Sequence, residues 1–350
     1  MRKIVLLLLV FLTILITGCS SSKDLAGPEE IYEVKNESLS IDDYFPFLEN
    51  TVFEYAGFGS EFAEKSSYFE YINGNRAQIK IINPGTNLLM IIENKGGLIK
   101  EIYSEGEFYH IENLLNIDAK GENILLKEPL EVGNVWETID GAKREITGVN
   151  VDIETPYGVL NAIEVSTFRK DAMDLDYYAP GLGLVASISR DKDIEVKSLL
   201  KSVNYKARKI AIEKYYPIDI DSDLVYVNGE INFETNASIE SLIEDILKNP
   251  NNEMLIPVIS PKTKLNSIQL DRNNWKLRAD FSPELISDMN YGGSMESKVL
   301  MSIVNTLGRF YDVDGITITI DGRAYESGHF YFKEDEVLEV NTEGMNEFRD

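Results

Sequence analysis

The amino-acid sequence predicts two folded parts, an antiparallel β domain over residues 45–206 and an α+β domain over residues 210–340. Three observations support this division. Apolar and polar residues alternate with a period of two in the first part, and turn signals separate the alternating runs. Apolar residues at helical spacing occur in the second part. A length of 350 residues also agrees with two domains and a short tether.

The first 19 residues have the pattern of an export signal that is removed from the mature chain. Arg2 and Lys3 precede an apolar run, Ile4–Ile16, which is shorter than the roughly 20 residues needed to span a bilayer. An Ile-Thr-Gly-Cys motif ending at Cys19 follows, and it resembles the lipobox of bacterial lipoproteins. Since the chain contains one cysteine, we interpret residues 1–18 as a lipoprotein signal peptide and Cys19 as the lipidation site. The resemblance implies a lipid anchor on the extracytoplasmic face of the cell membrane.

Residues 19–44 are predicted to form a lipidated, flexible tether. They contain three consecutive serines, several glutamates and little apolar periodicity, so they cannot bury enough surface to fold alone. The whole chain carries 59 acidic and 34 basic residues, a formal net charge of −25. Such a charge repels nucleic-acid phosphates and anionic lipid headgroups. We therefore expect no nucleic-acid partner, and contact with the membrane through the lipid anchor.

The β domain is predicted from its alternating runs. In Arg76–Ile82 and again in Val149–Glu154, apolar residues occupy every second position, which gives one apolar face and one wet face. Turn signals such as Asn73-Gly74 and Thr155-Pro156-Tyr157-Gly158 separate these runs. No long helical pattern interrupts them, so we expect either a β-sandwich or an open, curved sheet.

The second domain is predicted to mix strands with two helices. Apolar residues lie on one face of the first helix, which ends before Pro250, and Ser294 is placed to cap the second helix. The expected order is ββαββαβ, with each helix covering one face of a small sheet. The expected elements are strands at 210–216 and 224–231, a helix at 238–249, strands at 264–270 and 275–281, a helix at 294–307 and a strand at 316–320. Residues 341–350 have the composition of a frayed polar tail.

Four segments of the second domain resemble the GerMN domain, which is found in sporulation and germination lipoproteins. They are Ile239–Pro250, which is similar to the leucine-rich helix of that family, Ile256–Leu265, Trp275–Leu285 and Leu300–Gly322. Asn249 stands where the family often has glycine, and a single copy of the domain is present. The resemblance implies a non-catalytic domain, similar to ring-building domains of envelope assemblies in sporulating cells. Residues 45–206 show a weaker resemblance to β-rich regions of other secreted lipoproteins.

Catalytic motifs are sparse in the sequence. Its two histidines, His110 and His329, lie outside any metal-ligand spacing, and neither a nucleophile elbow nor a phosphate-binding glycine loop is present. His110 lies in a strand-like run, Phe108–Ile111, where a structural role is the favoured interpretation. With 59 acidic residues, carboxylate pairs suited to glycoside hydrolysis arise by chance. We therefore expect a protein that is not an enzyme, without catalytic residues or a cofactor.

One acidic segment has the spacing of a calcium loop. The residues at the first, third, fifth and twelfth positions of an EF-hand pattern are Asp219, Asp221, Asp223 and Glu230. Leu224 occupies the position where that loop needs glycine, and strand-like runs flank the segment. We interpret it as an acidic hairpin turn and expect no metal site. Asp312–Gly315 is likewise predicted to be a turn before the last strand.

The β domain is rich in aromatic residues, namely Phe53, Tyr55, Tyr68, Phe69, Tyr71, Tyr177 and Tyr178. A curved sheet with an aromatic interior can hold an apolar ligand, as small barrels do. Aromatic residues are also favoured in ordinary sheet cores. A ligand cavity and an ordinary core therefore stay open as alternatives.

Together these features favour a membrane-anchored, extracytoplasmic lipoprotein that acts as a non-catalytic scaffold or adaptor in a cell-envelope assembly of sporulation or spore germination. Its expected partners are envelope proteins, bound through residues 210–340. The first alternative is a ligand-binding lipoprotein that carries an apolar or cell-wall-derived molecule in its β domain. The second is an extracytoplasmic hydrolase, which would need two facing carboxylates.

We expect Cys19→Ala to abolish lipidation, because the thiol of Cys19 is the acceptor of the diacylglyceryl group. Acyl labelling with membrane fractionation measures this. The variant should carry no label and should either leave the membrane or remain unprocessed, whereas Ser22→Ala should behave as the unaltered chain. A Cys19→Ala chain that is acylated, processed and membrane-bound would contradict the anchor.

Overall fold

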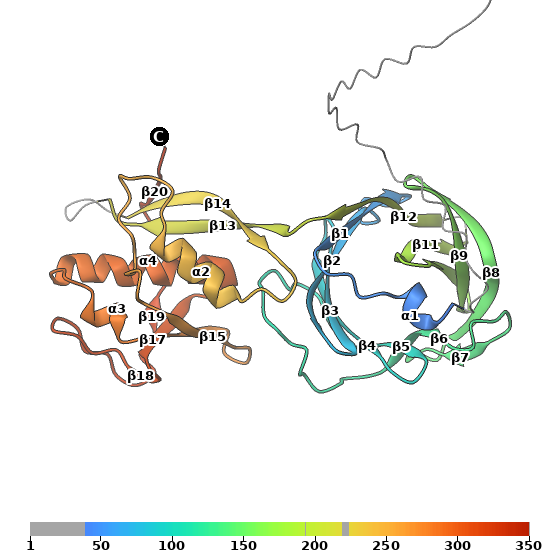
Figure 1. Cartoon of the computed structure of the whole chain (residues 1–350), viewed down its shortest axis with the longest axis horizontal. Helices are drawn as coiled ribbons and strands as arrows, with labels where there is room; N and C mark the ends of the chain where they lie inside the picture. The colour runs from blue at the N-terminus through green and yellow to red at the C-terminus, as the bar shows by residue number, and fades with distance from the viewer. Residues whose placement is uncertain (1–38, 193, 219–223, 350) are drawn as a thin grey trace, which may run out of the picture. The chain divides into compact units, whose positions relative to one another are not determined.

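A computed structural model describes residues 39–192, 194–218 and 224–349 (Figure 1). These residues belong to one compact unit. The predicted signal peptide at 1–18, Cys19 and most of the predicted tether lie outside the described residues. Among the residues described, no helix is long and apolar enough to cross a membrane.

Twelve strands of the first domain form one antiparallel sheet. In chain order they are β1 (Thr51–Phe58), β2 (Lys65–Asn73), β3 (Arg76–Ile82), β4 (Asn87–Asn94), β5 (Leu98–Glu105), β6 (Asn123–Lys127), β7 (Val135–Glu137), β8 (Lys143–Thr155), β9 (Gly158–Phe168), β10 (Ala172–Ala179), β11 (Gly183–Asp191) and β12 (Ile194–Tyr205). Their order in the sheet is β6-β5-β4-β3-β2-β1-β12-β11-β10-β9-β8-β7. The predicted turns after Asn73 and after Thr155 connect β2 to β3 and β8 to β9.

The sheet curves until its two edge strands, β6 and β7, come close, which makes a nearly closed barrel (Figure 1). Side chains bridge this seam in place of a backbone ladder. Trp136 Nε1 donates to the carbonyl oxygen of Ile124 at 3.0 Å, and Arg144 Nη1 donates to the same oxygen at 2.9 Å. Asn134 Nδ2 donates to the Lys127 carbonyl at 2.9 Å. The prediction of a β-rich antiparallel domain is confirmed, with a curved sheet and not a sandwich.

The outer face of the barrel wall is partly buried, which the alternating pattern did not predict. In β3, Ile79 points into the barrel core, as expected. Gln78 and Lys80 lie on the face that the pattern assigns to water, yet they are only 0% and 1% exposed. The loop between β5 and β6, residues 106–122, covers them, and Gln78 Nε2 donates to the Glu112 carbonyl at 2.8 Å. A period of two separates the faces of a strand but does not reveal a further layer of chain.

A short helix, α1 (Ile41–Tyr44), lies against the barrel and corrects the predicted extent of the tether, 19–44. Ile41 and Tyr44 are buried in the barrel core. The backbone N–H of Ile41 donates to Glu128 Oε1 at 3.1 Å. This bond attaches the helix to the residue that follows β6, at one edge of the sheet. The acidic composition of this region predicted a tether, but two apolar side chains at helical spacing are enough to hold its last residues on the barrel.

The second domain contains two sheets instead of the single small sheet that was expected. Its elements are β13 (Arg208–Tyr216), β14 (Val225–Phe233), α2 (Ile239–Lys248), β15 (Leu265–Asp271), β16 (Lys276–Phe281), α3 (Glu284–Ser287), α4 (Gly293–Tyr311), β17 (Gly315–Ile320), β18 (Arg323–Ala324), β19 (Leu338–Glu339) and β20 (Asn346–Glu347). β13, β14 and β20 form one sheet; β15, β16, β17 and β18 form the other, in which β19 also pairs with β17. Helix α4 packs against β13 and β17, and α2 packs against β15.

Both long helices occur where the apolar periodicity predicted them, but the second has different ends. Ser238 caps α2, and its Oγ accepts a backbone N–H from the first turn at 3.2 Å. Ser294 does not cap α4, because the N-cap residue is Gly292. The helix continues to Tyr311, and Asp312 ends it in the left-handed conformation, with φ of 53°. The predicted turn before β17 is therefore present.

The predicted frayed tail, 341–350, is bound to the second domain in its described part. Asn305 in α4 is fully buried, and its Nδ2 donates to the Asn341 carbonyl at 2.7 Å. The Asn341 N–H donates back to Asn305 Oδ1 at 2.9 Å. β20 then pairs in parallel with β14, and the Phe348 N–H donates to the Tyr226 carbonyl at 2.8 Å. A buried amide needs hydrogen-bond partners, and here the tail supplies them.

One apolar cluster contains residues of both domains, whereas a second cluster fills the barrel. Tyr71 in β2 and Phe233 in β14 meet edge to face, with ring centroids 5.7 Å apart. Tyr68 Oη donates to the Phe233 carbonyl at 3.0 Å. The outer wall of the barrel is thus packed against the first sheet of the second domain.

We expect both domains to stay folded when the chain is cut between β12 and β13, because each would keep a core of its own and lose only the contacts between them. A protease site inserted between Lys206 and Ala207 provides the cut. Calorimetry of the cleaved protein should show cooperative unfolding of both 45–206 and 210–340, and the uncut insertion variant is the control. Loss of all cooperative unfolding after cleavage would show that the two parts fold only together.

Candidate functional site

The interior of the barrel contains a cavity of about 530 Å³. Its wall is mainly apolar and includes Phe53, Tyr55, Phe69, Ile79, Met90 and Tyr178. Small-molecule sites usually have volumes of roughly 300–1,000 Å³, and small barrels can hold a single ligand. The cavity reaches the surface beside the turn between β1 and β2, where Phe62 lines it and is 52% exposed. The barrel therefore has the size, lining and opening of a binding site.

The register of β1 and β2 determines which side chains face this cavity. Tyr55 pairs with Lys65, and Phe53 pairs with Ser67. Directly paired residues project from the same face of a sheet, so Lys65 and Ser67 point inward with the two aromatic rings. Phe69 follows at the next alternate position of β2 and also lines the cavity. Lys65 thereby places a cationic group on an apolar wall.

Lys65 lies in this wall without an anionic partner. Among the described residues its ammonium group makes no hydrogen bond or ion pair; its one recorded contact is with the ring of Tyr55, whose centroid lies 5.2 Å from Nζ. Burial lowers the pKa of Lys65, and the carboxylate of Asp176 opposes this from beyond ion-pair distance. Burial also raises the pKa of Tyr55 to about 12. Its hydroxyl donates to the Leu184 carbonyl at 2.9 Å.

Asp176 lines the same cavity, but other groups already engage its carboxylate. Oδ1 accepts from Ser187 Oγ at 2.6 Å, and Oδ2 lies 3.9 Å from Arg144 Nη2. Arg144 is buried as well, and its Nε donates to Thr167 Oγ1 at 2.8 Å. Ser187 and Arg144 thus hold the Asp176 carboxylate from the side of β8 and β11.

The structure divides the aromatic residues that the sequence singled out. Those that line the barrel interior are Phe53, Tyr55, Phe69 and Tyr178. Tyr177 projects from the opposite face to its neighbours Asp176 and Tyr178, and its Oη donates to Glu164 Oε2 at 2.7 Å. Tyr68 and Tyr71 face outward, into the cluster shared with the second domain. Sequence reasoning missed Lys65. The available signal was its spacing, because Lys65, Ser67 and Phe69 occupy alternate positions of one strand.

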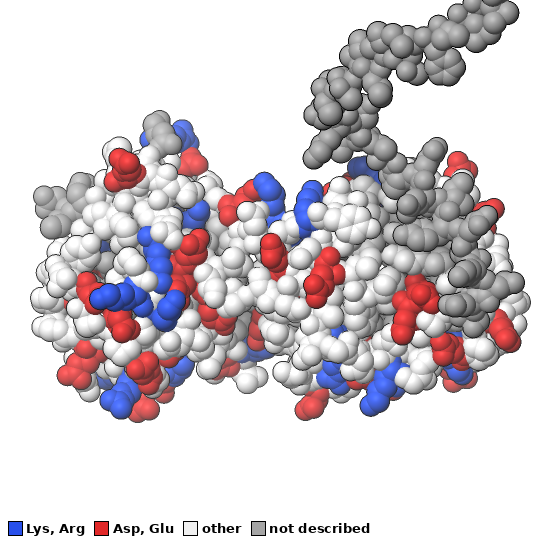
Figure 2. Space-filling view, in the orientation of Figure 1, with Lys and Arg blue, Asp and Glu red and all other residues white. Residues whose placement is uncertain are grey.

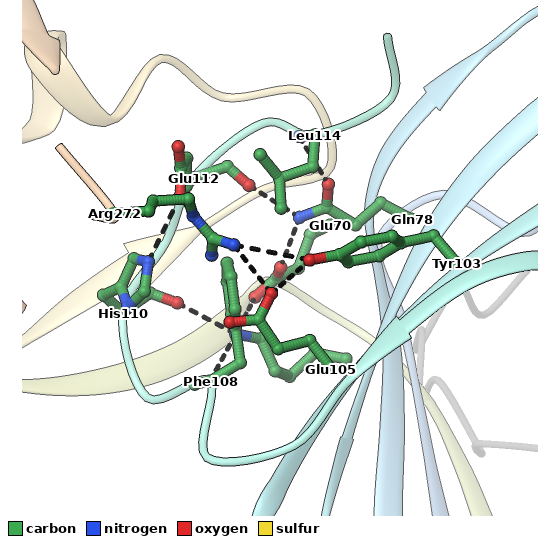
Figure 3. A network of polar contacts seen from close by, with 10 residues as sticks. Glu70, Gln78, Tyr103, Glu105, Phe108, His110, Glu112, Leu114 and Arg272 are labelled. Carbon is green, nitrogen blue, oxygen red and sulfur yellow. Dashed lines mark hydrogen bonds and ion pairs between the residues drawn. The ribbon is translucent and has the colours of Figure 1, made fainter. Parts of the chain in front are cut away.

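A polar network joins the outer barrel wall to the second domain (Figure 3). Arg272, in the turn between β15 and β16, donates from Nη1 to Glu105 Oε2 at 2.7 Å and from Nε to Glu112 Oε2 at 3.0 Å. Tyr103 Oη also donates to Glu105. Partial burial would raise the pKa of Glu105, but the hydrogen bonds from Arg272 and Tyr103 outweigh it and lower that pKa. One arginine thus holds two acidic residues of the first domain.

Glu70 lies at the centre of the inner part of this network and is 0% exposed. Its carboxylate accepts from Gln78 Nε2 at 2.9 Å and from Arg208 Nη1 at 2.8 Å. Lys80 Nζ lies 3.6 Å from Glu70 Oε1. Burial lowers the pKa of Arg208, and the Glu70 carboxylate opposes this shift. A buried anion between two cations is a structural arrangement, with every charge paired.

Lys80 also fastens the 106–122 loop to the barrel wall. Its Nζ donates to the carbonyl oxygens of Phe108 and His110, both at 2.8 Å, and lies 4.1 Å from the centroid of the Phe108 ring. Burial lowers the pKa of Lys80 to about 8, while Glu70 acts to raise it. Four neighbouring groups therefore stabilise this buried ammonium.

His110 lies in this loop and not in a strand, so the strand predicted at Phe108–Ile111 was wrong. Its apolar residues cover the barrel wall instead of extending the sheet. The imidazole ring lies 4.2 Å from the ring of Phe108 and 5.5 Å from that of Tyr311, measured between centroids. Its Nε2 is 3.4 Å from Glu112 Oε2. His110 is thus a packing residue between the two domains.

The other residues considered from the sequence lie away from the barrel interior. His329 is half exposed, with Nδ1 at 2.7 Å from Glu296 Oε2, and Glu230 pairs with Lys209 at 2.6 Å. The calcium-like spacing falls mostly outside the described residues, at Asp219, Asp221 and Asp223. Within the ranges that the structure describes, no group of three histidine, cysteine, aspartate or glutamate side chains could hold a metal ion.

The second domain matches a known family. Residues 213–326 match the family model named Germane, which is described as sporulation and spore germination. The chain therefore carries a GerMN-like domain, and the resemblance that four sequence segments indicated is confirmed. The match begins within β13 and ends just beyond β18.

Solved structures add more distant similarities. A protein from Bacteroides fragilis with a YmcC-like fold is 12% identical over 46% of this chain and 98% of its own, with a TM-score of 0.30. The tandem GerMN domains of the sporulation protein GerM from Bacillus subtilis are 20% identical over 40% of this chain and 51% of theirs, with a TM-score of 0.29. The chain thus spans about half of that tandem. No curated protein matches the chain.

We expect Arg272→Ala to weaken the attachment between the domains. The substitution leaves Glu105 and Glu112 without their shared cation, and lost hydrogen bonds of this kind cost about 1–3 kcal/mol. Thermal unfolding should show a lower midpoint, and proteolysis near Lys206 should become faster. Arg323→Ala, at an exposed position of β18, should change neither. Identical behaviour of the two variants would mean that the Arg272 contacts contribute nothing to the interface.

Proposed function

We propose that this chain is an extracytoplasmic lipoprotein of sporulation or spore germination, in which the GerMN-like domain binds envelope proteins without catalysing a reaction. The family match over residues 213–326 is the observation that carries this proposal. The lipobox-like motif at Cys19 supplies the anchor that the proposal requires. The proposed location is the outer face of the cell membrane, with the lipid as the contact to the bilayer.

The second domain offers a strand edge for a protein partner. β15 pairs with β16 on one side and stands at the edge of its sheet. An edge strand presents unpaired backbone groups, to which a strand of another protein can add. Gln269 and Asp271 on this strand are exposed, whereas Glu244 Oε2 accepts from the N–H of Leu265 at 3.0 Å and closes the first position. The later half of the edge borders a groove that residues 111–116 of the 106–122 loop also line.

The surface charge agrees with selective protein contact more than with adhesion to anionic surfaces. Acidic and basic side chains are interspersed over the face shown in Figure 2. The net charge of −25 is therefore not collected into one patch on that face. Mixed charges favour partners with a complementary pattern, and the negative excess disfavours phosphate-rich surfaces.

A second function is favoured by a different observation, the apolar cavity of about 530 Å³ in the barrel. We infer that the β domain binds a small ligand there, so that the chain joins a ligand-binding domain to a partner-binding domain. The outer wall of the same barrel is packed against the GerMN-like domain. β2 and β3 contribute side chains both to the barrel core and to the cluster shared with the second domain. A change in these strands on ligand binding would therefore be transmitted to the second domain.

We expect Gln269→Lys to reduce partner binding several-fold, because a lysine on an edge strand opposes strand addition. Crosslinking of the anchored protein in sporulating cells, followed by identification of the trapped partners, measures the effect. Asn232→Lys introduces the same charge at an exposed position of β14 and is the matched control. Both variants should unfold at the temperature of the unaltered protein. Equal crosslinking by the two variants would remove the β15 edge from the proposed interface.

A chain that keeps the anchor and the β domain but lacks residues 210–350 tests the larger proposal. It should lose the crosslinked partners together with the sporulation or germination phenotype. Full function in this truncated chain would show that the β domain, and not the GerMN-like domain, carries the function.

A further inference from the structure

The position of Lys65 has no explanation in the packing of the barrel. Its side chain comes from the first residue of β2 and points into the cavity, opposite Tyr55. A cation in an apolar environment costs several kcal/mol unless an anion and hydrogen bonds compensate it. Among the described residues Lys65 makes no hydrogen bond or ion pair; it has the face of an aromatic ring at 5.2 Å and the Asp176 carboxylate beyond ion-pair distance. Lys65 is partly exposed and lines the cavity.

Two features of the cavity limit what could bind there. The lining around Lys65 is dominated by aromatic and aliphatic side chains, so the ligand must be largely apolar. The cation needs an anion, and a carboxylate forms a short, charge-assisted hydrogen bond with an ammonium group. A volume of about 530 Å³ suits a single chain or a compact ring system, and not both chains of a diacyl lipid.

The second charged group of the cavity favours a single negative charge on the ligand. Asp176 lines the same space and carries a carboxylate that Ser187 and Arg144 hold in place. A ligand with two negative charges would face one cation at Lys65 and the repulsion of Asp176. A monoanion gains the ion pair with less repulsion.

We propose that the barrel cavity binds an amphipathic monocarboxylate, with the carboxylate on the Lys65 ammonium group and the apolar body along Phe53, Phe69 and Met90. This assignment rests on the ligand-binding function proposed above and names the class of ligand. The ligand enters beside the turn between β1 and β2, where Phe62 is half exposed. Ser67, inward-facing and two residues from Lys65, lines the same part of the cavity, where its hydroxyl lies against that of Tyr55.

The test compares three probes with the same apolar chain: decanoic acid, decan-1-ol and decyl phosphate. The protein is the mature-length chain with Cys19→Ala, which removes the acyl groups that could compete for the cavity. Titration calorimetry should give decanoate an affinity about tenfold or more above that of decanol, from one charge-assisted hydrogen bond. Decyl phosphate should bind more weakly than decanoate.

Lys65→Met isolates the charge, because methionine keeps most of the apolar stem. It should bring decanoate affinity down to that of decanol and leave decanol binding unchanged. Lys197→Met on β12 is the matched control, since Lys197 pairs with Glu195 at 2.6 Å and does not line the cavity. The control should keep the preference for decanoate. Lys65→Gln provides a second neutral variant should the methionine variant fail to fold.

The outcomes distinguish failure of the carboxylate assignment from failure of the proposed ligand binding by the barrel. Equal affinity for decanoate and decanol, unchanged in Lys65→Met, would overturn the carboxylate assignment while the ligand-binding function stands. Tighter binding of decyl phosphate than of decanoate would likewise overturn it and assign a phosphate ligand. Absence of binding for all three probes would overturn both the assignment and the proposed binding of small ligands by the barrel.

Discussion

The buried carboxylate of Glu70 is the group on which the joining of the two domains depends. It lies on β2 and is contacted by Gln78 and Lys80 from β3 and by Arg208 from the first residue of β13. Removing one partner of a buried ion pair leaves an uncompensated charge, which is more costly than never having formed the pair. Lys80 then fixes the 106–122 loop through two carbonyl oxygens, and that loop brings Glu112 to Arg272. The interface between barrel and GerMN-like domain is thus built outward from one anion.

The sequence predicted correctly those features that depend on residues close together in the chain. Alternation in Arg76–Ile82 predicted a strand and its inward face, and apolar periodicity predicted the helix α2. It did not predict features that depend on contacts between segments far apart in the chain. Gln78 and Lys80 fit a solvated face, and only the loop that folds over them makes that face an interior. The same applies to Asn305, whose burial in α4 is made possible by backbone groups 36 residues later in the chain.

The sequence indicated that the β domain could contain a ligand cavity, but it did not show that the cavity exists or which residues line it. The abundance of aromatic residues in the β domain left a cavity and an ordinary core as alternatives, and composition alone cannot separate them. The difference lies in the closure of the sheet: Trp136 and Arg144 bridge β7 and β8 to β6, so the inner faces surround a space instead of packing on a second sheet. Tyr68 faces the outer cluster because it alternates with the inward-facing Phe69. Tyr71 joins it because a β2 irregularity between Phe69 and Tyr71 changes the register of that strand.

Lys65 and Lys80 lie in the same barrel wall, but their ammonium groups have different surroundings. Lys80 has a carboxylate at 3.6 Å, two carbonyl oxygens at 2.8 Å and an aromatic ring at 4.1 Å, and burial still lowers its pKa to about 8. Lys65 on the opposite face has an aromatic ring at 5.2 Å and the carboxylate of Asp176 beyond ion-pair distance. The fold is therefore able to satisfy a buried ammonium group and does not do so at Lys65. Positions where a sequence breaks a rule of packing without compensation tend to be functional, because stability alone would not retain them. The presence of lysine at this place therefore points to a ligand that completes the site.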